Sequence, residues 1–251
     1  MNARSETRVS RVHATAFATH PFGIGGHALV ADRSGALYWP QEKTLIVADL
    51  HLEKGSAFAM RGRMLPPYDT RETIARLAEA IGRYLPARVI ALGDSLHDRG
   101  AEARIEPDDL RALRALQSGR DWVWVTGNHD PQISRAMGGR VVDSLESCVE
   151  SNDGRRPPLS LRHAPCAAAV LEIAGHLHPV ARLGGRRQSL RRPCFIASAR
   201  RLVMPAFGAF TGGLNVRDDA FKPFFGDDAI RVCMLGRDGV YPVPVEHLLA
   251  D

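Results

Sequence analysis

Residues 44–51, Thr-Leu-Ile-Val-Ala-Asp-Leu-His, decide the fold of this chain. The apolar run, with its β-branched residues, predicts a short buried strand, and Asp-Leu-His places polar side chains at the end of that strand. Two later stretches repeat the design, because residues 88–94 end in Gly-Asp and residues 122–130 end in Gly-Asn-His-Asp. In open α/β sheets, ligands bind beyond the carboxyl ends of the strands, so these ends are where a site is expected.

Helical patterns lie between these strands. Residues 69–85 carry apolar side chains at three- and four-residue steps, which predicts a helix, and Asp69 with Glu72 resembles a capping box at its start. Residues 107–116 predict a second helix with Pro107 in its first turn. The alternation of strand and helix predicts an α/β core with at least one largely parallel stretch of sheet.

Further strands are predicted on both sides of this core. Before it, residues 28–31 and 36–39 form a hairpin around a polar turn. After it come strand-like stretches with few helical signals between them, at residues 159–162, 170–174, 195–197 and 232–235. A second sheet, packed on the first, would contain these stretches.

The composition excludes several classes of protein. The 251 residues are 45% apolar and 24% charged, which excludes a mainly disordered chain and fits one large domain or two small ones. No apolar stretch is long enough to span a membrane, and the polar residues 1–10 predict a loose tail rather than a secretory signal. Four scattered cysteines without a C-x-x-C pair predict reduced, mostly buried thiols and a cytoplasmic location.

The basic residues are almost all arginines, and the formal net charge is +5. Seven arginines fall in one short acid-free span, at Arg182, Arg186, Arg187, Arg191, Arg192, Arg200 and Arg201. Two interpretations stay open. The span is either an electrostatic footprint for a polyanion, or a solvated face in a chain whose genome prefers arginine codons.

Carboxylates, imidazoles and one carboxamide occur in five short motifs: D-x-H, G-D, G-N-H-D, a lone histidine, and G-H-x-H. In the D-x-H and G-H-x-H motifs the two polar residues stand two positions apart, a spacing at which strand side chains point to the same side. Nitrogen and oxygen donors of this kind suit a first-row divalent metal. With one carboxylate shared, they supply two ions with four protein ligands each. The candidate ligands are Asp49, His51, Asp94, Asn128, His163, His176 and His178.

The order of these motifs resembles the calcineurin-like metallophosphoesterases. The resemblance implies an α/β fold in which two mixed β-sheets pack as a sandwich flanked by helices, in a single domain over residues 1–251. It implies that Asp49, His51 and His178 hold one metal, that Asn128, His163 and His176 hold the other, and that Asp94 bridges them. His129 would be the catalytic imidazole above the phosphate, which does not bind metal.

A narrower resemblance is to the ligase-associated, DNA-damage-response branch of these enzymes. It rests on residues 50–55, Leu-His-Leu-Glu-Lys-Gly, and on residues 204–213, Met-Pro-Ala-Phe-Gly-Ala-Phe-Thr-Gly-Gly. It implies a phosphodiesterase or endonuclease that acts on single-stranded DNA in repair, in functional association with a DNA ligase and a helicase. We expect two Mn²⁺ ions, with Fe or Zn as alternatives.

Two other functions remain open at this stage. The substrate is a small nucleotide or a phosphomonoester if the metals lie in a closed pocket, whereas a long basic groove favours nucleic acid. A third hypothesis, from another class, is a metal-bound scaffold for repair partners without catalysis. Because every ligand and His129 are present, the sequence favours an enzyme.

Some neighbouring residues have no settled role. Where many protein phosphatases carry an aspartate three residues after the bridging one, this chain has His97, followed by Asp98. Arg61 and Arg63 either contact a substrate phosphate or are solvated loop charges. Phe58, Met60 and Met64 are expected to be packing residues rather than a base-stacking platform, and a cap over the site is left open for their region.

Overall fold

The strand that precedes the D-x-H motif lies in the middle of a mixed sheet. In the computed structural model, which describes residues 19–147, 150–151, 154–155, 157–184 and 189–251, this first sheet has neighbouring strands in chain order. They are β1 (Thr19–Ile24), β2 (His27–Asp32), β3 (Leu37–Trp39), β4 (Thr44–Val47), β5 (Arg88–Leu92), β6 (Asp121–Val125) and β7 (Arg140–Val142). From β4 to β7 the strands are parallel, and from β1 to β4 they are antiparallel.

The second half of the chain forms the other sheet. Its order is β17 (Val240–Val243), β16 (Arg231–Leu235), β14 (Leu190–Ala197), β15 (Arg201–Val203), β12 (Glu172–Ala174), β11 (Leu159–Arg162) and β8 (Ser144–Ser147). Strand β13 (Val180–Leu183) pairs with β14, and β9 (Glu150–Ser151) pairs with β10 (Gly154–Arg155). Only β11, β12 and β15 run parallel, so this sheet is also mixed, as predicted.

Alternate side chains of each central strand enter two different cores. Ile46 of β4 packs between the two sheets with residues such as Phe195, whereas Leu45 and Val47 pack against the helices with Leu77. This explains the unbroken apolar run in the sequence, because both faces of the strand are covered. The α/β sandwich of two mixed sheets is therefore confirmed.

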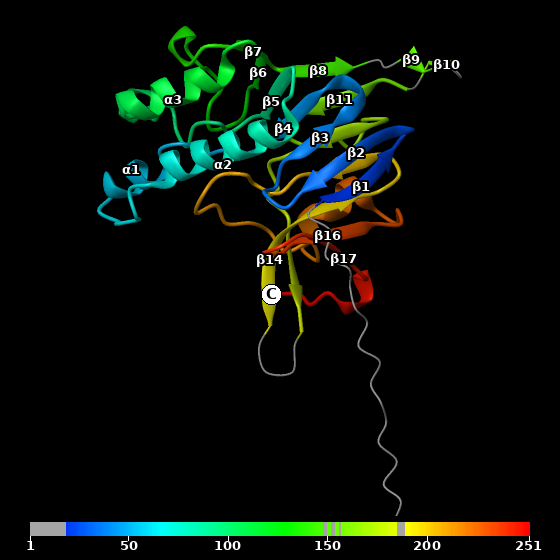
Figure 1. Ribbon diagram of the computed structural model, residues 1–251. Coiled ribbons are helices and arrows are strands. Elements are labelled where there is room, and N and C mark those ends of the chain that lie inside the picture. The colour runs from blue at the N-terminus through cyan, green and yellow to red at the C-terminus, as the bar shows by residue number, and fades with distance from the viewer. Residues whose placement is uncertain (1–18, 148–149, 152–153, 156, 185–188) are drawn as a thin grey trace, which may run out of the picture.

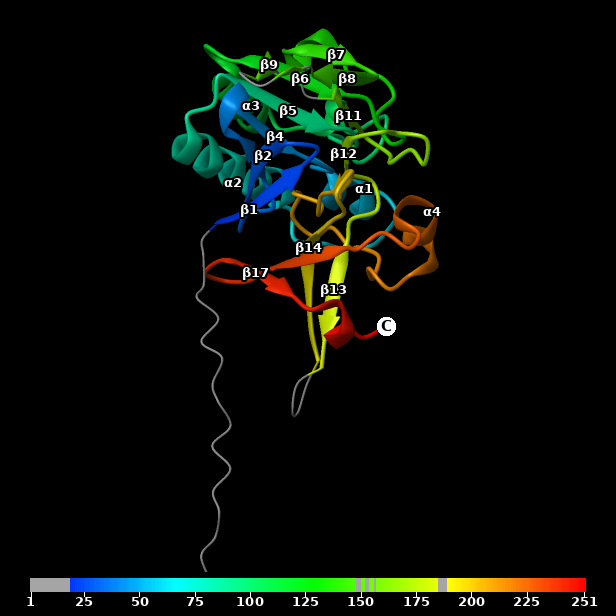
Figure 2. The ribbon, with the colours of Figure 1, turned by 90° about the vertical axis from the view of Figure 1, so that its right-hand side faces the viewer.

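Helices cover the outer faces of both sheets. They are α1 (Lys54–Ala59), α2 (Asp69–Tyr84), α3 (Pro107–Gln117) and α4 (Lys222–Phe225). Helices α2 and α3 pack on the first sheet, and α4 packs on the second. Figure 1 shows α2 and α3 on one side of the first sheet, with the second sheet on the other. Figure 2 shows β13 and β14 extending away from α2 and α3. No helix in the described ranges is long and apolar enough to cross a membrane.

The helix α2 has the predicted length but not the predicted cap. The expected capping box of Asp69 and Glu72 is wrong, because the N-terminal cap is Tyr68 and makes no side-chain bond. Asp69 is buried, and its carboxylate accepts a hydrogen bond from the Gly55 N–H at 3.0 Å. The Asp69 carboxylate thus bonds a distant backbone N–H instead of capping the N-terminus of α2.

The three cysteines within the described residues match the prediction of reduced, mostly buried thiols. Cys166, Cys194 and Cys233 are free thiols, and the last two are buried. Cys148 and the predicted tail at residues 1–10 lie outside the described residues.

Candidate metal centre

The five motifs meet at one edge of the sandwich. Asp49, Asp94 and Asn128 follow β4, β5 and β6, which are parallel neighbours, so their carboxyl ends lie together. His163 and His176 follow β11 and β12 of the other sheet, which are also parallel. The sheets are joined here, because the His176 N–H donates to Asp49 Oδ2 at 2.9 Å.

The backbone at these ends departs from the strand geometry that the spacing suggested. Asp49 and His51 have φ of 55° and 44°, and His176 and His178 have φ of 71° and 44°. These left-handed conformations cost of order 1–3 kcal/mol each in residues other than glycine. We expected Asp49 and His51, and likewise His176 and His178, to point to the same side because they were neighbours within a strand. This reason is wrong, since each pair lies in a tight loop beyond its strand. The side chains still converge.

Asp49, His51 and His178 form a first cluster. The Nε2 atoms of His51 and His178 are 3.3 Å apart, and His178 Nε2 lies 3.2 Å from Asp49 Oδ1. His178 Nδ1 is the donor of a hydrogen bond to the Gly212 carbonyl, so its Nε2 carries a lone pair. Asp49 Oδ1 is buried without a hydrogen-bond partner. A cation between these atoms would satisfy all of them.

Asp94, Asn128, His163 and His176 form a second cluster. His163 Nε2 lies 2.9 Å from Asn128 Oδ1, 3.1 Å from His176 Nδ1 and 3.4 Å from Asp94 Oδ2. His163 Nδ1 donates its proton to the Leu92 carbonyl. A proton on Nε2 could form a hydrogen bond to only one of the three neighbouring atoms, so protonation alone would leave the others without a partner. A metal ion accepts a lone pair from each. Both clusters have ligand atoms close enough to hold an ion.

Asp94 lies between the two clusters. Its Oδ2 is 4.0 Å from His51 Nε2 of the first cluster and 3.4 Å from His163 Nε2 of the second. The structure therefore brings together the seven side chains that were predicted as ligands, and the bridging role of Asp94 stays a prediction.

Burial and charge shift the pKa values of these groups. Burial, helped by the nearby His178, lowers the pKa of His51 to about 2. Burial opposes ionisation of Asp94, but the hydrogen bond and charge of His163 outweigh it and lower the Asp94 pKa to about 2. Burial also opposes a charge on His163, yet its contacts with Asp94 and Asp49 raise the His163 pKa to about 8. The second cluster thus attracts positive charge.

His129 is held at the rim of the site by a backbone group. Its Nδ1–H donates to the carbonyl of His97 at 2.7 Å, and its Nε2 faces inward, 3.9 Å from Asp94 Oδ2. The ring of His97 stacks on that of His129, with centroids 5.6 Å apart. Asp98 does not support His129, because its carboxylate pairs with Arg104 and accepts the Gly100 N–H. His51, His97 and His129 also lie close enough together to form a third potential ligand group.

Asp130 is a residue whose role the sequence did not reveal. Its buried carboxylate accepts the backbone N–H groups of Asp94, Ser95, Leu96 and Gly127, at 2.6–3.1 Å. These contacts fix the loop that carries Asp94 against the loop that carries Asn128. Its position directly after G-N-H was the available signal, but an aspartate in a loop has many other uses.

The segment 204–213 contacts the backbone next to Asp49 and the ring of His178. The N–H groups of Phe207 and Gly208 donate to the carbonyls of Ala48 and Asp49, and Gly212 accepts the hydrogen bond of His178. This segment, which carried the narrower resemblance, therefore fixes the backbone of the first cluster.

The arginines of this span that the structure describes do not form one exposed face. Arg201 is buried and pairs with Glu172, so its expected place in a footprint is wrong. Arg191 and Arg200 pair with Asp251 and Asp228, and Arg192 is exposed. Arg186 and Arg187 lie outside the described residues.

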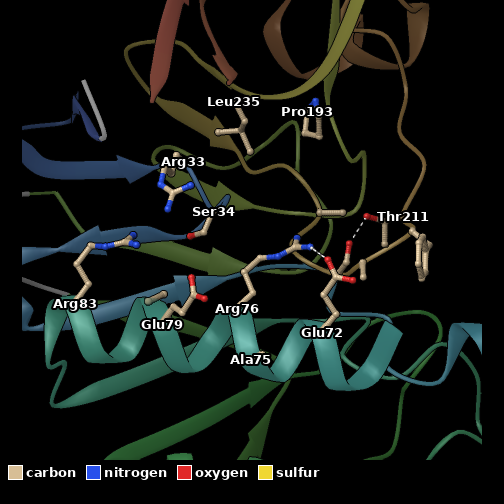
Figure 3. Close-up of a pocket in the computed structure, with 15 residues that line it drawn as sticks. Arg33, Ser34, Glu72, Ala75, Arg76, Glu79, Arg83, Pro193, Thr211 and Leu235 are labelled. Atoms are coloured by element: carbon tan, nitrogen blue, oxygen red, sulfur yellow. Dashed lines mark hydrogen bonds and ion pairs between the residues drawn. The ribbon is translucent and has the colours of Figure 1, made fainter. Parts of the chain in front are cut away.

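A separate pocket of about 540 Å³ lies between α2 and residues 206–211, and none of the predicted ligands lines it. Figure 3 shows Arg33, Arg76 and Arg83 in it beside Glu72 and Glu79. Arg76 pairs with Glu72, and Arg83 pairs with Asp32. The mixed and largely compensated charges give this pocket no preference for an anion.

The chain is similar to known proteins. The family model of calcineurin-like phosphoesterases matches residues 42–191. The structure of the nuclease MPE from Pseudomonas putida is 29% identical, covers 90% of this chain and 100% of its own, and has a TM-score of 0.65. The phosphoesterase Yfce from E. coli is 15% identical, covers 80% and 97%, and has a TM-score of 0.38. No curated protein sequence matches the chain.

Proposed function

The chain belongs to the calcineurin-like phosphoesterase family, and from this premise we propose that it is a dinuclear, metal-dependent phosphodiesterase that cleaves single-stranded DNA in repair. It is a hydrolase of phosphoester bonds. The observation that carries the proposal is the convergence of seven nitrogen and oxygen donors in two clusters joined by Asp94.

We assign the first metal to Asp49, His51 and His178, the second to Asn128, His163 and His176, and the bridge to Asp94. The buried Asp49 Oδ1 without a partner and the facing imidazole lone pairs support this division. Mn²⁺ is the proposed ion, and the donors would also accept Fe or Zn. Ions bound there would neutralise the charge that develops on the phosphate oxygens during an in-line displacement.

His129 is proposed as the proton donor to the leaving alkoxide. Its Nδ1–H is held by the His97 carbonyl, so Nε2 is the atom that faces the substrate. A proton passes from Nε2 to the leaving oxygen as the bond to phosphorus breaks. The backbone contact fixes the ring plane and leaves Nε2 without a competing hydrogen bond, which suits a general acid.

Nucleic acid is favoured as substrate by the likeness to a nuclease over most of both chains. The segment 204–213, which the narrower resemblance connects with the repair branch, contacts the first cluster directly. Functional association with a ligase and a helicase belongs to the same proposal.

The decisive experiment is cleavage of a single-stranded DNA circle by the purified chain with Mn²⁺, Fe²⁺ or Zn²⁺, alongside a chelator control. We expect linear product with Mn²⁺ and none with the chelator. Hydrolysis of a nitrophenyl diester without cleavage of the circle would favour a small substrate. If metal binds but neither substrate is hydrolysed, the chain is a scaffold.

A further inference from the structure

The segment 54–68, called the rim segment below, lies beside the imidazoles of the metal centre. It comprises α1 and the turn that leads to α2, and it begins three residues after His51. The ring of Phe58 is 5.9 Å from that of His97, which in turn lies 5.4 Å from His51 and 5.6 Å from His129. Figure 1 shows α1 and its following turn projecting at one end of α2.

The base of the rim segment is firmly fixed. The Gly55 N–H donates to Asp69, and the hydroxyls of Thr70 and Ser56 donate to the buried carboxylate of Glu53, at 2.8 and 2.6 Å. These contacts tie α1 to the start of α2. The turn that follows α1 is therefore anchored at its base by hydrogen bonds to the start of α2.

The turn itself exposes large apolar side chains. Met60, Met64 and Tyr68 are 74%, 84% and 61% exposed. The expectation that Met60 and Met64 are packing residues is wrong, because neither is buried against the body of the protein. Three such exposed side chains occur within nine residues, so a ligand that binds this turn would meet apolar groups.

The charge of the rim segment has one sign. It contains Lys54, Arg61 and Arg63 and no acidic residue. Within the described part of the chain, none of these three forms an ion pair, in contrast to Arg76 and Arg83 of the pocket beside α2. The Lys54 ammonium lies 5.8 Å from the centre of the Phe58 ring, which packs beside His97, so the positive charge of the segment lies next to the site.

We propose that the rim segment is a platform for single-stranded nucleic acid, in which Met60, Met64 and Tyr68 contact unpaired bases while Arg61 and Arg63 bind the adjoining phosphates. This rests on the proposed function and adds the means by which its substrate is selected. Apolar and aromatic side chains interleaved with cations are the features that bind single strands without sequence preference.

A duplex fits this surface less well. Its base faces are stacked inside the helix, so Met60, Met64 and Tyr68 would meet only sugar and phosphate. A mononucleotide has a single base, so it could contact only some of the exposed side chains at Met60, Met64 and Tyr68. The rim segment thus favours strands with several accessible bases.

The test uses the full chain in chelator, so that binding is measured without cleavage. Affinity for a short oligothymidine and for a duplex of equal length is followed by fluorescence anisotropy at several salt concentrations. The apolar variant combines Met64→Ala with Tyr68→Ala, and its control is Val170→Ala, which is also highly exposed. The charge variant combines Arg61→Gln with Arg63→Gln, and its control is Arg114→Gln, an exposed arginine of α3.

We expect the apolar variant to bind oligothymidine about tenfold more weakly for each stacked base lost, with a smaller change for the duplex. The charge variant should flatten the salt dependence by a slope of roughly 1.4, about 0.7 for each phosphate contact removed. With Mn²⁺ present, the ratio of circle cleavage to nitrophenyl diester hydrolysis should fall in both variants.

Wild-type binding of oligothymidine by both variants would overturn the platform. Binding to anionic lipid vesicles is measured for the same variants. If the variants lose binding to the vesicles but keep wild-type affinity for oligothymidine, the platform is also overturned, and the rim segment is assigned to a membrane surface. Failure of the proposed function looks different, because the wild-type chain would then leave the DNA circle intact with every metal, whatever its affinity for oligothymidine.

Discussion

At the scale of single residues, the seven donors that we propose as metal ligands are distinct from His129, which we propose faces the substrate. Asp94 lies between both clusters, at 4.0 Å from His51 Nε2 and 3.4 Å from His163 Nε2. His129 approaches from the rim and is held through the His97 carbonyl. Neighbouring residues of one catalytic centre should therefore respond differently to the same substitution.

The substitution His129→Ala should leave two metal ions per chain and lower diester turnover by about 10²- to 10⁴-fold, the usual contribution of a general acid. Asp94→Ala should lose metal as well as activity. Metal content by elemental analysis and turnover of two diesters check this. The loss in His129→Ala should be smaller for a nitrophenyl diester, whose leaving group needs no proton. An empty site in His129→Ala would contradict the division of roles.

At the scale of elements, the strand ends are shaped by segments that are distant in sequence. Residues 207–208 donate to the backbone after β4, and Asp69 of α2 bonds the start of α1. The Gly208 contact holds the left-handed backbone of Asp49, and the His51 N–H donates to the Asp94 carbonyl. A change in a supporting segment should consequently disturb the site without touching a ligand.

Gly208→Ala tests this support. A Cβ at residue 208 would collide with the carbonyl oxygen of Leu50, which is backbone and cannot rotate away. We expect a loss of stability of about 1–3 kcal/mol and a weaker affinity for Mn²⁺, measured by urea unfolding and by calorimetry. Gly212→Ala is the matched control, because a Cβ there meets nothing within 4 Å. Equal metal affinity in both variants would show that the segment does not shape the site.

The turn after β2 is tied to the end of α2 by a buried carboxylate. Asp32 accepts hydrogen bonds from Arg83 at 2.5 Å, Tyr84 at 2.7 Å and the Ser34 N–H at 2.8 Å. Burial opposes ionisation of Asp32, but these donors outweigh it and lower its pKa below the ordinary 3.8. The stabilisation is therefore fully present above pH 3.8 and is lost as pH falls through the lower folded-state pKa.

Asp32→Asn should accordingly be less stable than the wild type at pH 7, by about 2 kcal/mol. The difference should shrink as the pH falls below 3.8, because the wild-type carboxylate then takes up its proton. Urea unfolding across this range measures it. Asp121→Asn is the control, since Asp121 pairs with Arg88 and Arg140 at the surface, where such pairs contribute less than about 1 kcal/mol. A constant difference at all pH values would exclude the ionised Asp32 as its source.

At the scale of the whole molecule, the sequence predicts what depends on local pattern. The strands β4, β5 and β6 were predicted because burial on both faces leaves an unbroken apolar run, and α2 and α3 because of their periodicity. The pairing of Arg201 with Glu172 was not, since the partners are 29 residues apart and meet only when β12 pairs with β15. The left-handed loops were missed for the same reason, because distant segments impose them. The donor types still indicated which side chains converge, because coordination chemistry depends on which donors are present.

The metal ions should also stabilise the sandwich. Asp49, His51, Asp94 and Asn128 follow strands of the first sheet, whereas His163, His176 and His178 follow strands of the second. Ions bound by both sets would tie the sheets together at one edge and bind the unfolded chain poorly. A ligand specific for the folded state stabilises it by RT ln(1 + [L]/Kd), about 2.7 kcal/mol for each site at a hundredfold excess over Kd.

Addition of a chelator should therefore lower the free energy of unfolding and the melting temperature of the wild-type chain. The loss should be reversed by Mn²⁺ in proportion to the logarithm of its free concentration. Asp94→Ala removes the shared carboxylate and should unfold at nearly the same temperature with or without chelator. Calorimetric melting over a range of Mn²⁺ concentrations measures both chains. If the wild-type melting temperature is independent of Mn²⁺, the two sheets do not share bound ions, and the donors that converge on Asp94 must be stabilised by protons instead.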